Sequence, residues 1–296
     1  MKGFAGVSIA EPVVRYLSGG GASGTHLSGV VRGSGSMAAY VDIDGFVIAI
    51  TGGTVPAMPN GVGVLQRHGL QAFHSGSAVS VGLDGIQCAG AEVALLNART
   101  WDPLVPQWDG AADGFSDTGK EIWWRLRLAR TADPSEMVER LARSGYEVAS
   151  DAGGRAGLGA LFRSLVDRDA GQARRAAALL VGRGPGLTPE GDDFLAAAAA
   201  TVYSCEHSID WLPKDLGAWR SAVLPDDLRE RTTSLSATLL ELAVEGYASD
   251  PVQTLLDLNA PFEEWHAQLN RLKKVGHGTG RAWAAGCAAT AILLTR

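Results

Sequence analysis

The hydrophobic spacing of this 296-residue chain changes once, close to Lys120, and this change restricts the fold more than any other feature. Before Lys120, short runs of Val, Ile and Ala alternate with turn residues, as on the two sides of Asp44-Gly45. Such a dipeptide between apolar runs is a strong signal for a β-hairpin. A second pair of apolar runs flanks Asp84-Gly85. We therefore expect a β-rich, mostly antiparallel N-terminal domain.

After Lys120 the apolar residues recur with the period of a helix, and Gly and Pro mark the ends of each run. The expected helices cover residues 134–144, 170–181, 188–207, 232–246, 261–274 and 279–295, with a shorter one within 247–256. The glycine-rich residues 104–120 predict a linker. The tryptophans expected in the core are Trp123, Trp124, Trp219, Trp265 and Trp283. The expected class is α+β, with a β-rich domain at residues 1–115 and a helical domain at 116–296.

Charge and cysteine content exclude several classes of function. With 26 basic and 32 acidic residues the net charge is −6, which argues against a nucleic-acid-binding body because such proteins need a basic face. The three cysteines are widely spaced without a CxxC pattern, so we expect buried free thiols. The N-terminus lacks the apolar run of a signal peptide, and the longest apolar stretch, residues 282–295, is too short to cross a bilayer. We expect a cytoplasmic protein.

Residues 182–193, GRGPGLTPEGDD, are the most informative segment of the chain. Thr188 followed by Pro189 is a helix-start signal, so Thr188 is expected to cap a buried helix. The glycines before and after it leave backbone N–H groups uncovered beside a helix N-terminus, and such groups bind anions. Arg183 is expected to add a bidentate contact to the anion. The alternative is an interhelical turn whose glycines only permit close packing.

Two other helix openings share this design. In residues 273–281 three glycines surround a histidine, and Thr279 is expected to cap the helix that follows. In residues 229–234 two threonines precede a helix. We hypothesise that the three openings converge on one small anionic ligand. The candidate anion-binding residues are Arg183, Gly184, Gly186, Thr188, Gly191, Thr232, Thr233, Gly276, Gly278, Thr279, Gly280 and Arg281.

The candidate catalytic residues are Asp192, Asp193 and His277. Neighbouring residues point about 100° apart on a helix, so one aspartate is expected to face the loop while the other supports the helix dipole. A carboxylate in this place suits a general base, an acceptor for a substrate amide, or a water-mediated ligand of Mg²⁺, the one cofactor considered. His277 lies between two glycines and is a candidate hydrogen-bond donor or proton shuttle. Stabilisation of the helix dipole alone is the alternative for both aspartates.

Residues 184–195, GPGLTPEGDDFL, resemble the signature G-x-G-x-G-L-T-P-x-G-D-D-F-L of a bacterial domain family. That family includes the H subunit of oxamate carbamoyltransferase, an enzyme of allantoin catabolism. RTTSLS at 231–236 and VGHGTG at 275–280 are similar to the family as well. The resemblance implies participation in carbamoyl transfer between carbamoyl phosphate and oxamate, which gives oxalurate and phosphate. It also implies protein partners, one of them similar to acyl-CoA synthetases.

The chain departs from the family pattern at two places. Arg281 and Trp283 stand where an acidic residue is expected soon after the second glycine motif, and Ala196-Ala197 stand where the family usually has a glycine. The first departure changes the charge of the presumed ligand site, so a paralogue with another substrate is an open alternative. Two function classes remain. One is a subunit of a carbamoyltransferase-like enzyme, and the other is a non-catalytic, metabolite-binding regulatory module that docks onto the acyl-CoA-synthetase-like partner.

Overall fold

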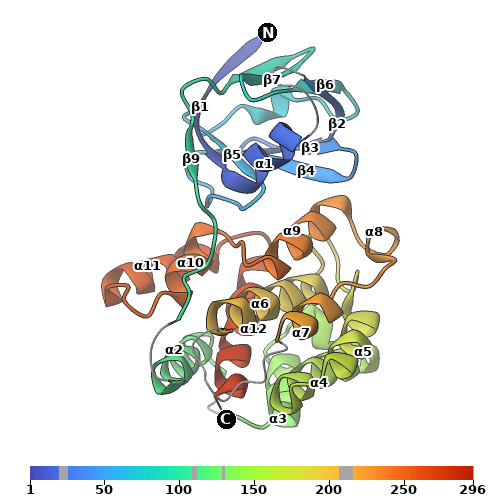
Figure 1. Cartoon of the computed structure of the whole chain (residues 1–296), viewed down its shortest axis with the longest axis vertical. Helices are drawn as coiled ribbons and strands as arrows, with labels where there is room; N and C mark the ends of the chain where they lie inside the picture. The colour runs from blue at the N-terminus through green and yellow to red at the C-terminus, as the bar shows by residue number, and fades with distance from the viewer. Residues whose placement is uncertain (20–25, 109–111, 129–130, 207–215, 296) are drawn as a thin grey trace. The chain divides into compact units, whose positions relative to one another are not determined.

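The computed structural model describes residues 1–19, 26–108, 112–128, 131–206 and 216–295. The chain forms two compact units, Met1–Pro103 and Leu104–Arg296. The first consists mainly of strands and the second of helices (Figure 1). The expected α+β class, β-rich first and helical second, is therefore confirmed.

The first unit is a sheet that closes on itself. Its strands are β1 (Lys2–Ala10), β2 (Leu27–Ser34), β3 (Ala38–Ile43), β4 (Phe46–Gly52), β5 (Gly61–Val64), β6 (Ala78–Val81), β7 (Gly85–Cys88), β8 (Ala91–Ala94) and β9 (Arg99–Trp101). They follow the order β5-β4-β3-β2-β6-β7-β8-β1-β9, and β1 also pairs with β5, which closes the ring of β1 to β8. Six of the nine strand pairings are antiparallel, as expected.

Both predicted hairpins are present in the first unit, although one turn is shifted. Asp44 and Gly45 have φ values of 49° and 91°, which are the left-handed conformations that a two-residue hairpin turn requires. In the second hairpin the turn residues are Leu83 and Asp84, enclosed by two backbone hydrogen bonds of 2.8 and 3.3 Å. The predicted turn at Asp84-Gly85 was one residue late, because Gly85 already belongs to β7. A Cβ at Gly85 would lie 2.7 Å from a carbonyl oxygen of β8, so glycine is needed there for strand pairing.

A helix that the sequence analysis did not predict, α1 (Glu11–Gly19), follows β1 directly. A proline in its first turn is compatible with a helix because that N–H would have no partner anyway. Val13 and Leu17, one turn apart, are buried. Tyr16 stacks on Phe46 of β4 with ring centroids 4.2 Å apart, so the helix covers part of the sheet.

The second unit contains eleven described α-helices. They are α2 (Ala112–Arg125), α3 (Pro134–Arg143), α4 (Ala152–Asp167), α5 (Ala170–Leu180), α6 (Glu190–Cys205), α7 (Leu216–Ala222), α8 (Leu228–Arg231), α9 (Ser234–Val244), α10 (Asp250–Leu256), α11 (Phe262–Leu272) and α12 (Thr279–Leu294). Six of them, α3, α5, α6, α9, α11 and α12, match the expected helices to within two residues at each described end, and α10 lies within the range 247–256 expected to hold a short helix. Among the described residues, no helix has the length and apolar content that crossing a membrane requires.

Four helices of this unit differ from the expectation, and two of them, α7 and α8, were not predicted. Residues 112–120, expected to belong to the linker, form part of α2. The whole of α4 was missed because glycines lower its helix propensity. Those glycines permit close packing: a Cβ at Gly157 would lie 2.7 Å from the side chain of Leu180, and one at Gly154 would overlap the carbonyl oxygen of Val148.

The core of the second unit is formed around α6 and α12, which pack side by side (Figure 1). Both helices are almost entirely buried and rich in alanine. A Cβ at Gly286 would lie 2.7 Å from the Cβ of Ala197, which shows how closely the two helices approach. The three cysteines are free and buried, as expected. Four of the five tryptophans expected in the core are buried; Trp124 is wrong, since 55% of it is exposed.

Candidate functional site

The three glycine- and hydroxyl-rich loops of the sequence analysis lie against one another at the N-terminus of α6. The name three-loop cluster is used for residues 182–189, 231–233 and 275–279 together with the buried side chains beside them, which are Tyr146, Glu190, Asp192, Asp193, Ser236 and Trp283. The hydroxyl oxygens of Thr188 and Thr279 are 2.7 Å apart and share a hydrogen bond. Thr233 donates to the carbonyl oxygen of Leu187 at 2.6 Å. The first loop thus contacts both of the others.

The threonines expected as helix caps have other roles. The N-cap of α6 is Pro189, and its carbonyl oxygen accepts from the N–H groups of Asp192 and Asp193 at 3.0 and 3.1 Å. The N-cap of α12 is Gly278. The predicted caps Thr188 and Thr279 were therefore wrong, because their hydroxyls are used in the bond that joins the two loops. Thr233 does cap α9, where its side chain accepts from the N–H of Ser236.

Several glycines of the cluster are fixed by packing. Gly182 has a φ of 74°, and a Cβ there would overlap the carbonyl oxygen of Arg231. Side chains at Gly191 and Gly280 would overlap the backbone of α5 and α11 in the same way. A Cβ at Gly278 would lie 2.5 Å from the Oε1 of Glu190. Glycine is therefore required at Gly182, Gly191 and Gly280 whether or not a ligand binds.

The backbone N–H groups proposed as anion donors fall into two groups. The N–H of Gly191 donates to the carbonyl oxygen of Arg183 at 2.9 Å, and that of Gly280 to Val275 at 3.1 Å. Those of Gly184, Gly186, Gly276 and Gly278 make no hydrogen bond to another described residue. The structure therefore leaves four of these donors open to a ligand.

Asp192 holds the cluster together. Its Oδ1 accepts from the N–H of Gly182 at 2.8 Å, and its Oδ2 accepts from the hydroxyls of Thr232 and Ser236, the latter at 2.7 Å. Only 2% of the residue is exposed, and burial raises the pKa of its carboxyl, although these hydrogen bonds oppose the shift. Since each oxygen has a partner from the chain, Asp192 links α6 to the other loops.

Asp193 is the unsatisfied acid of the cluster. Its Oδ1 accepts from the indole N–H of Trp283 at 3.2 Å, but its buried Oδ2 accepts no hydrogen bond from any described residue. Burial raises the pKa of this carboxyl well above 3.8, and the neighbouring charge of Asp192 adds to the shift. An unpaired buried carboxyl oxygen costs free energy, so this atom is suited to binding a hydrogen-bond donor from outside the chain.

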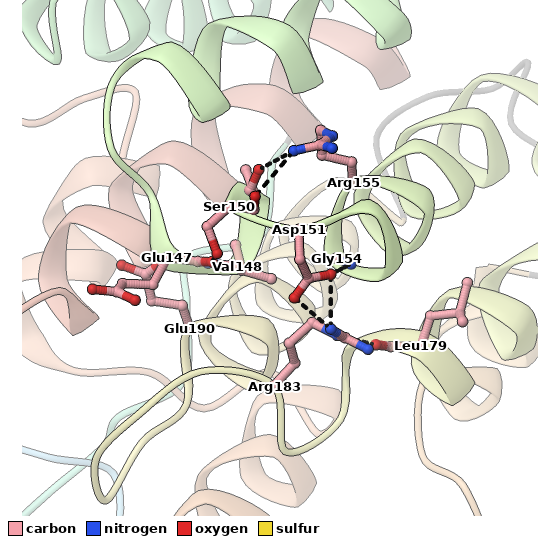
Figure 2. A network of polar contacts seen from close by, with 10 residues as sticks. Glu147, Val148, Ser150, Asp151, Gly154, Arg155, Leu179, Arg183 and Glu190 are labelled. Carbon is pink, nitrogen blue, oxygen red and sulfur yellow. Dashed lines mark hydrogen bonds and ion pairs between the residues drawn. The ribbon is translucent and has the colours of Figure 1, made fainter.

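Glu190 is a third buried acid in the first turn of α6. Its Oε2 accepts from the N–H of Val148 at 3.0 Å (Figure 2). Burial raises the pKa of Glu190, and the charge of Arg281 partly opposes this shift. The guanidinium of Arg281 lies 4.8 Å from the ring centre of Tyr146, whose pKa burial raises to about 12. The first turn of α6 thus already contains three acidic side chains of its own.

Arg183, predicted to bind an anion, is paired within the chain. Figure 2 shows its guanidinium directed at Asp151, the N-cap residue of α4, with N–O distances of 2.8 and 3.0 Å. It also donates to the carbonyl oxygen of Leu179 at 2.9 Å. His277 is exposed, beside Gly278 at the edge of the cluster. Among the described residues, no group of three or more His, Cys, Asp or Glu side chains is placed to hold a metal ion.

Sequence reasoning missed four residues of the cluster, namely Tyr146, Glu190, Ser236 and Trp283. Glu190 and Ser236 lie within the two motifs quoted above, and the signal that was overlooked is their polarity inside otherwise apolar helices. Trp283 was assigned to the core; it is buried there, and its N–H binds Asp193. Tyr146 lies far from the motifs in sequence, and no local pattern marks it.

Of the comparisons with known proteins, one gives a match, and it falls on the segment that contains the three loops. A comparison with curated proteins gives no match, and neither does one with solved structures. The model of a family described as oxamate carbamoyltransferase subunit AllH matches residues 180–291. This range contains the three loops together with α6, α9 and most of α12. Residues 180–291 of this chain are therefore AllH-like, and they relate it to a subunit of oxamate carbamoyltransferase.

Proposed function

We propose that this chain is a subunit of an oxamate carbamoyltransferase-related enzyme and that its three-loop cluster binds the carbamoyl-bearing substrate. One observation is decisive for the proposal. Asp193 presents a buried carboxyl oxygen without a partner inside the segment that matches the AllH family. The cluster also contains backbone N–H groups that make no hydrogen bond to a described residue, so it offers both an acceptor and donors.

The two substrates of such an enzyme share this polarity. Oxamate and carbamoyl phosphate each have an amide NH₂ at one end and an anionic group at the other. Asp193 Oδ2 would accept from the NH₂, and the N–H groups of Gly184, Gly186 and Gly278 would donate to the anion. Arg281 and Arg183 would add positive charge, as the sequence analysis proposed.

The raised pKa of Asp193 supports a role as general base. A carboxyl whose pKa is raised takes a proton more readily than an ordinary aspartate. In the proposed step the amide nitrogen of oxamate attacks the carbamoyl carbon of carbamoyl phosphate, the new N–C bond forms, and the C–O bond to phosphate breaks. The nitrogen loses its proton to Asp193, and phosphate leaves. His277, at the exposed edge, would donate a hydrogen bond or a proton to the departing phosphate.

We further propose that partner subunits complete the active site in the cytoplasm, one of them similar to an acyl-CoA synthetase. The cluster has buried acids and no metal-binding group among its described residues, so a bound Mg²⁺ would need ligands from the substrate or the partner. The alternative, a regulatory module, would use the same cluster to bind the metabolite without transferring the carbamoyl group.

Titration calorimetry of the full chain with oxamate, oxalurate, carbamoyl phosphate and inorganic phosphate tests the binding step. We expect binding of the carbamoyl compounds and at least a tenfold loss of affinity in Asp193→Asn, because the new NH₂ faces the substrate NH₂. A matched control is Cys205→Ser, a change at the other end of α6. If Asp193→Asn folds and binds these compounds as tightly as the wild type, the proposed site is wrong.

The rate of carbamoyl transfer by the chain reconstituted with its partner subunits distinguishes an enzyme subunit from a regulatory module. The enzyme proposal expects turnover that Asp193→Asn abolishes. Binding without any effect of Asp193→Asn on turnover would favour the regulatory module.

A further inference from the structure

A second polar region of the helical unit is formed by residues outside the three-loop cluster. A cavity of about 520 Å³ opens between the C-terminal end of α2 and one face of α11. Its lining residues are Trp124, Arg125, Arg127, Leu128, His266, Asn270 and Lys273. This volume lies in the range of small-molecule sites, which are about 300–1,000 Å³.

The cavity is basic although the chain as a whole is acidic. Arg125, Arg127 and Lys273 contribute three positive charges, and none of the described lining residues is acidic. Arg125 is paired with Glu121 at 2.7 Å. Arg127 and Lys273 form no ion pair with a described residue. Two uncompensated cations beside one hollow favour a ligand with a doubly charged anionic group.

Flat side chains lie at the same place. Trp124, expected in the core, is 55% exposed and lines the cavity. Phe262 at the start of α11 is 58% exposed and stacks on His266 one turn later, with ring centroids 6.1 Å apart. The guanidinium of Arg125 lies 5.7 Å from the Trp124 ring centre and 5.4 Å from that of Phe262. Exposed aromatic faces next to cations are suited to stacking a planar ring.

Arg127 is held in an unusual backbone conformation. Its φ is 63°, in the left-handed region where glycine or asparagine is normally found at a helix end. Its N–H donates to the carbonyl oxygen of Trp124 at 2.8 Å, and that of Leu128 donates to Trp123 at 3.1 Å. These two bonds define the helix-ending motif in which glycine is preferred. An arginine at this position places a cation at the cavity at the expense of backbone strain.

We propose that this cavity binds a phosphate ester attached to a planar ring, the chemistry of a nucleotide. Arg127 and Lys273 bind the phosphate, Asn270 donates to it or to the sugar, and Trp124 stacks on the ring. The proposal is independent of the three-loop cluster, because no residue of the cavity belongs to the cluster.

Equilibrium binding of AMP to the full chain tests this proposal, with adenosine and inorganic phosphate as partial ligands. We expect AMP to bind at least tenfold more tightly than either partial ligand. Equal affinity for adenosine would overturn the role of the cations. Equal affinity for inorganic phosphate would overturn the role of the ring, and the absence of AMP binding would overturn the proposal as a whole.

Two arginine variants identify the site without a risk to folding. Arg127→Gly suits the left-handed backbone and removes the cation, so we expect an unchanged or higher Tm and at least a tenfold loss of AMP affinity. Arg168→Gly is the matched control, since Arg168 also has a positive φ, 55°, at the end of α4 and does not line the cavity. Unchanged AMP affinity in Arg127→Gly, or equal losses in both variants, would contradict the proposal.

Discussion

Two places in the helical unit hold their charged residues in opposite ways. At the start of α6 three acids are buried, and most of their oxygens accept hydrogen bonds from the chain itself. Between α2 and α11 three cations line an open hollow, and among the described residues only Arg125 has a carboxylate partner there. Burial forces polar groups to find partners within the fold, whereas exposure leaves them for a ligand. Within the motif, the candidates for ligand contact are therefore the groups without a partner among the described residues, namely Asp193 Oδ2 and the open backbone N–H groups.

The largest effect is expected from Asp192→Ala, which tests whether the Asp192 carboxylate holds the three loops together. The change leaves the N–H of Gly182 and the hydroxyls of Thr232 and Ser236 without their acceptor. We expect a loss of about 3–5 kcal/mol in the free energy of unfolding, measured with urea. Asp192→Asn keeps one acceptor oxygen and should lose about 1–2 kcal/mol. A loss below about 1 kcal/mol in Asp192→Ala would mean that the loops are held by other contacts.

Trp283→Phe should have the next largest effect. It removes the only N–H that a described side chain donates to Asp193, and it shortens a buried ring. We expect a loss of about 2 kcal/mol in unfolding free energy. Trp265→Phe is the control, because Trp265 is equally buried but packs on Phe262, whereas Trp283 donates to Asp193. Equal losses in the two variants would show that the bond from the indole to Asp193 contributes nothing.

Asp193→Asn should change the pH dependence of stability. The raised pKa means that the folded state holds the proton more tightly than the unfolded chain, whose value is near 3.8. The stability that results is present below that pH and is lost as the pH rises toward the folded pKa. As the pH rises from acid to neutral, the free energy of unfolding of Asp193→Asn should thus increase by about 1 kcal/mol relative to that of the wild type. Urea titrations at several pH values measure this difference; a constant difference would contradict the raised pKa.

The smallest effect is expected in the basic cavity. Glycine in place of Arg127 relieves the strain of a left-handed backbone, which stabilises the fold, but it also increases the freedom of the unfolded chain, which opposes that gain. The free energy of unfolding of Arg127→Gly should therefore rise by at most about 1 kcal/mol. Thermal unfolding beside Arg168→Gly measures this gain. A clear loss of stability in Arg127→Gly alone would mean that the Arg127 side chain supports the fold. The contrast between the cations of the cavity and the buried acids at the start of α6 would then disappear.

Much of the fold follows from local sequence signals. Asp44-Gly45 encodes its turn because few residues adopt two successive left-handed conformations. Pro134 begins α3 as expected, and Asp133 caps it with hydrogen bonds of 2.9 Å. In α4, local propensity gave the wrong answer, because its glycines permit close contacts with Val148, just before the helix, and with α5, which follows it.

The candidate site was predictable only in part. The motif residues were correctly expected to meet, since three similar loops each open a helix of one domain. The partner of each side chain was not predictable: Arg183 pairs with Asp151, and Thr188 with Thr279. Such choices depend on which groups the packing places within about 3 Å.

The sequence by itself determined the two-part organisation, most helices and the location of the glycine-rich motif, because periodicity and turn residues act over a few positions. The tertiary structure decided which polar groups remain without a partner. It left Asp193 Oδ2 in the core without a hydrogen bond from any described residue, and it exposed Trp124 while burying Trp123 beside it. Neighbours on a helix point about 100° apart, so only the packing of the whole unit selects which one faces solvent.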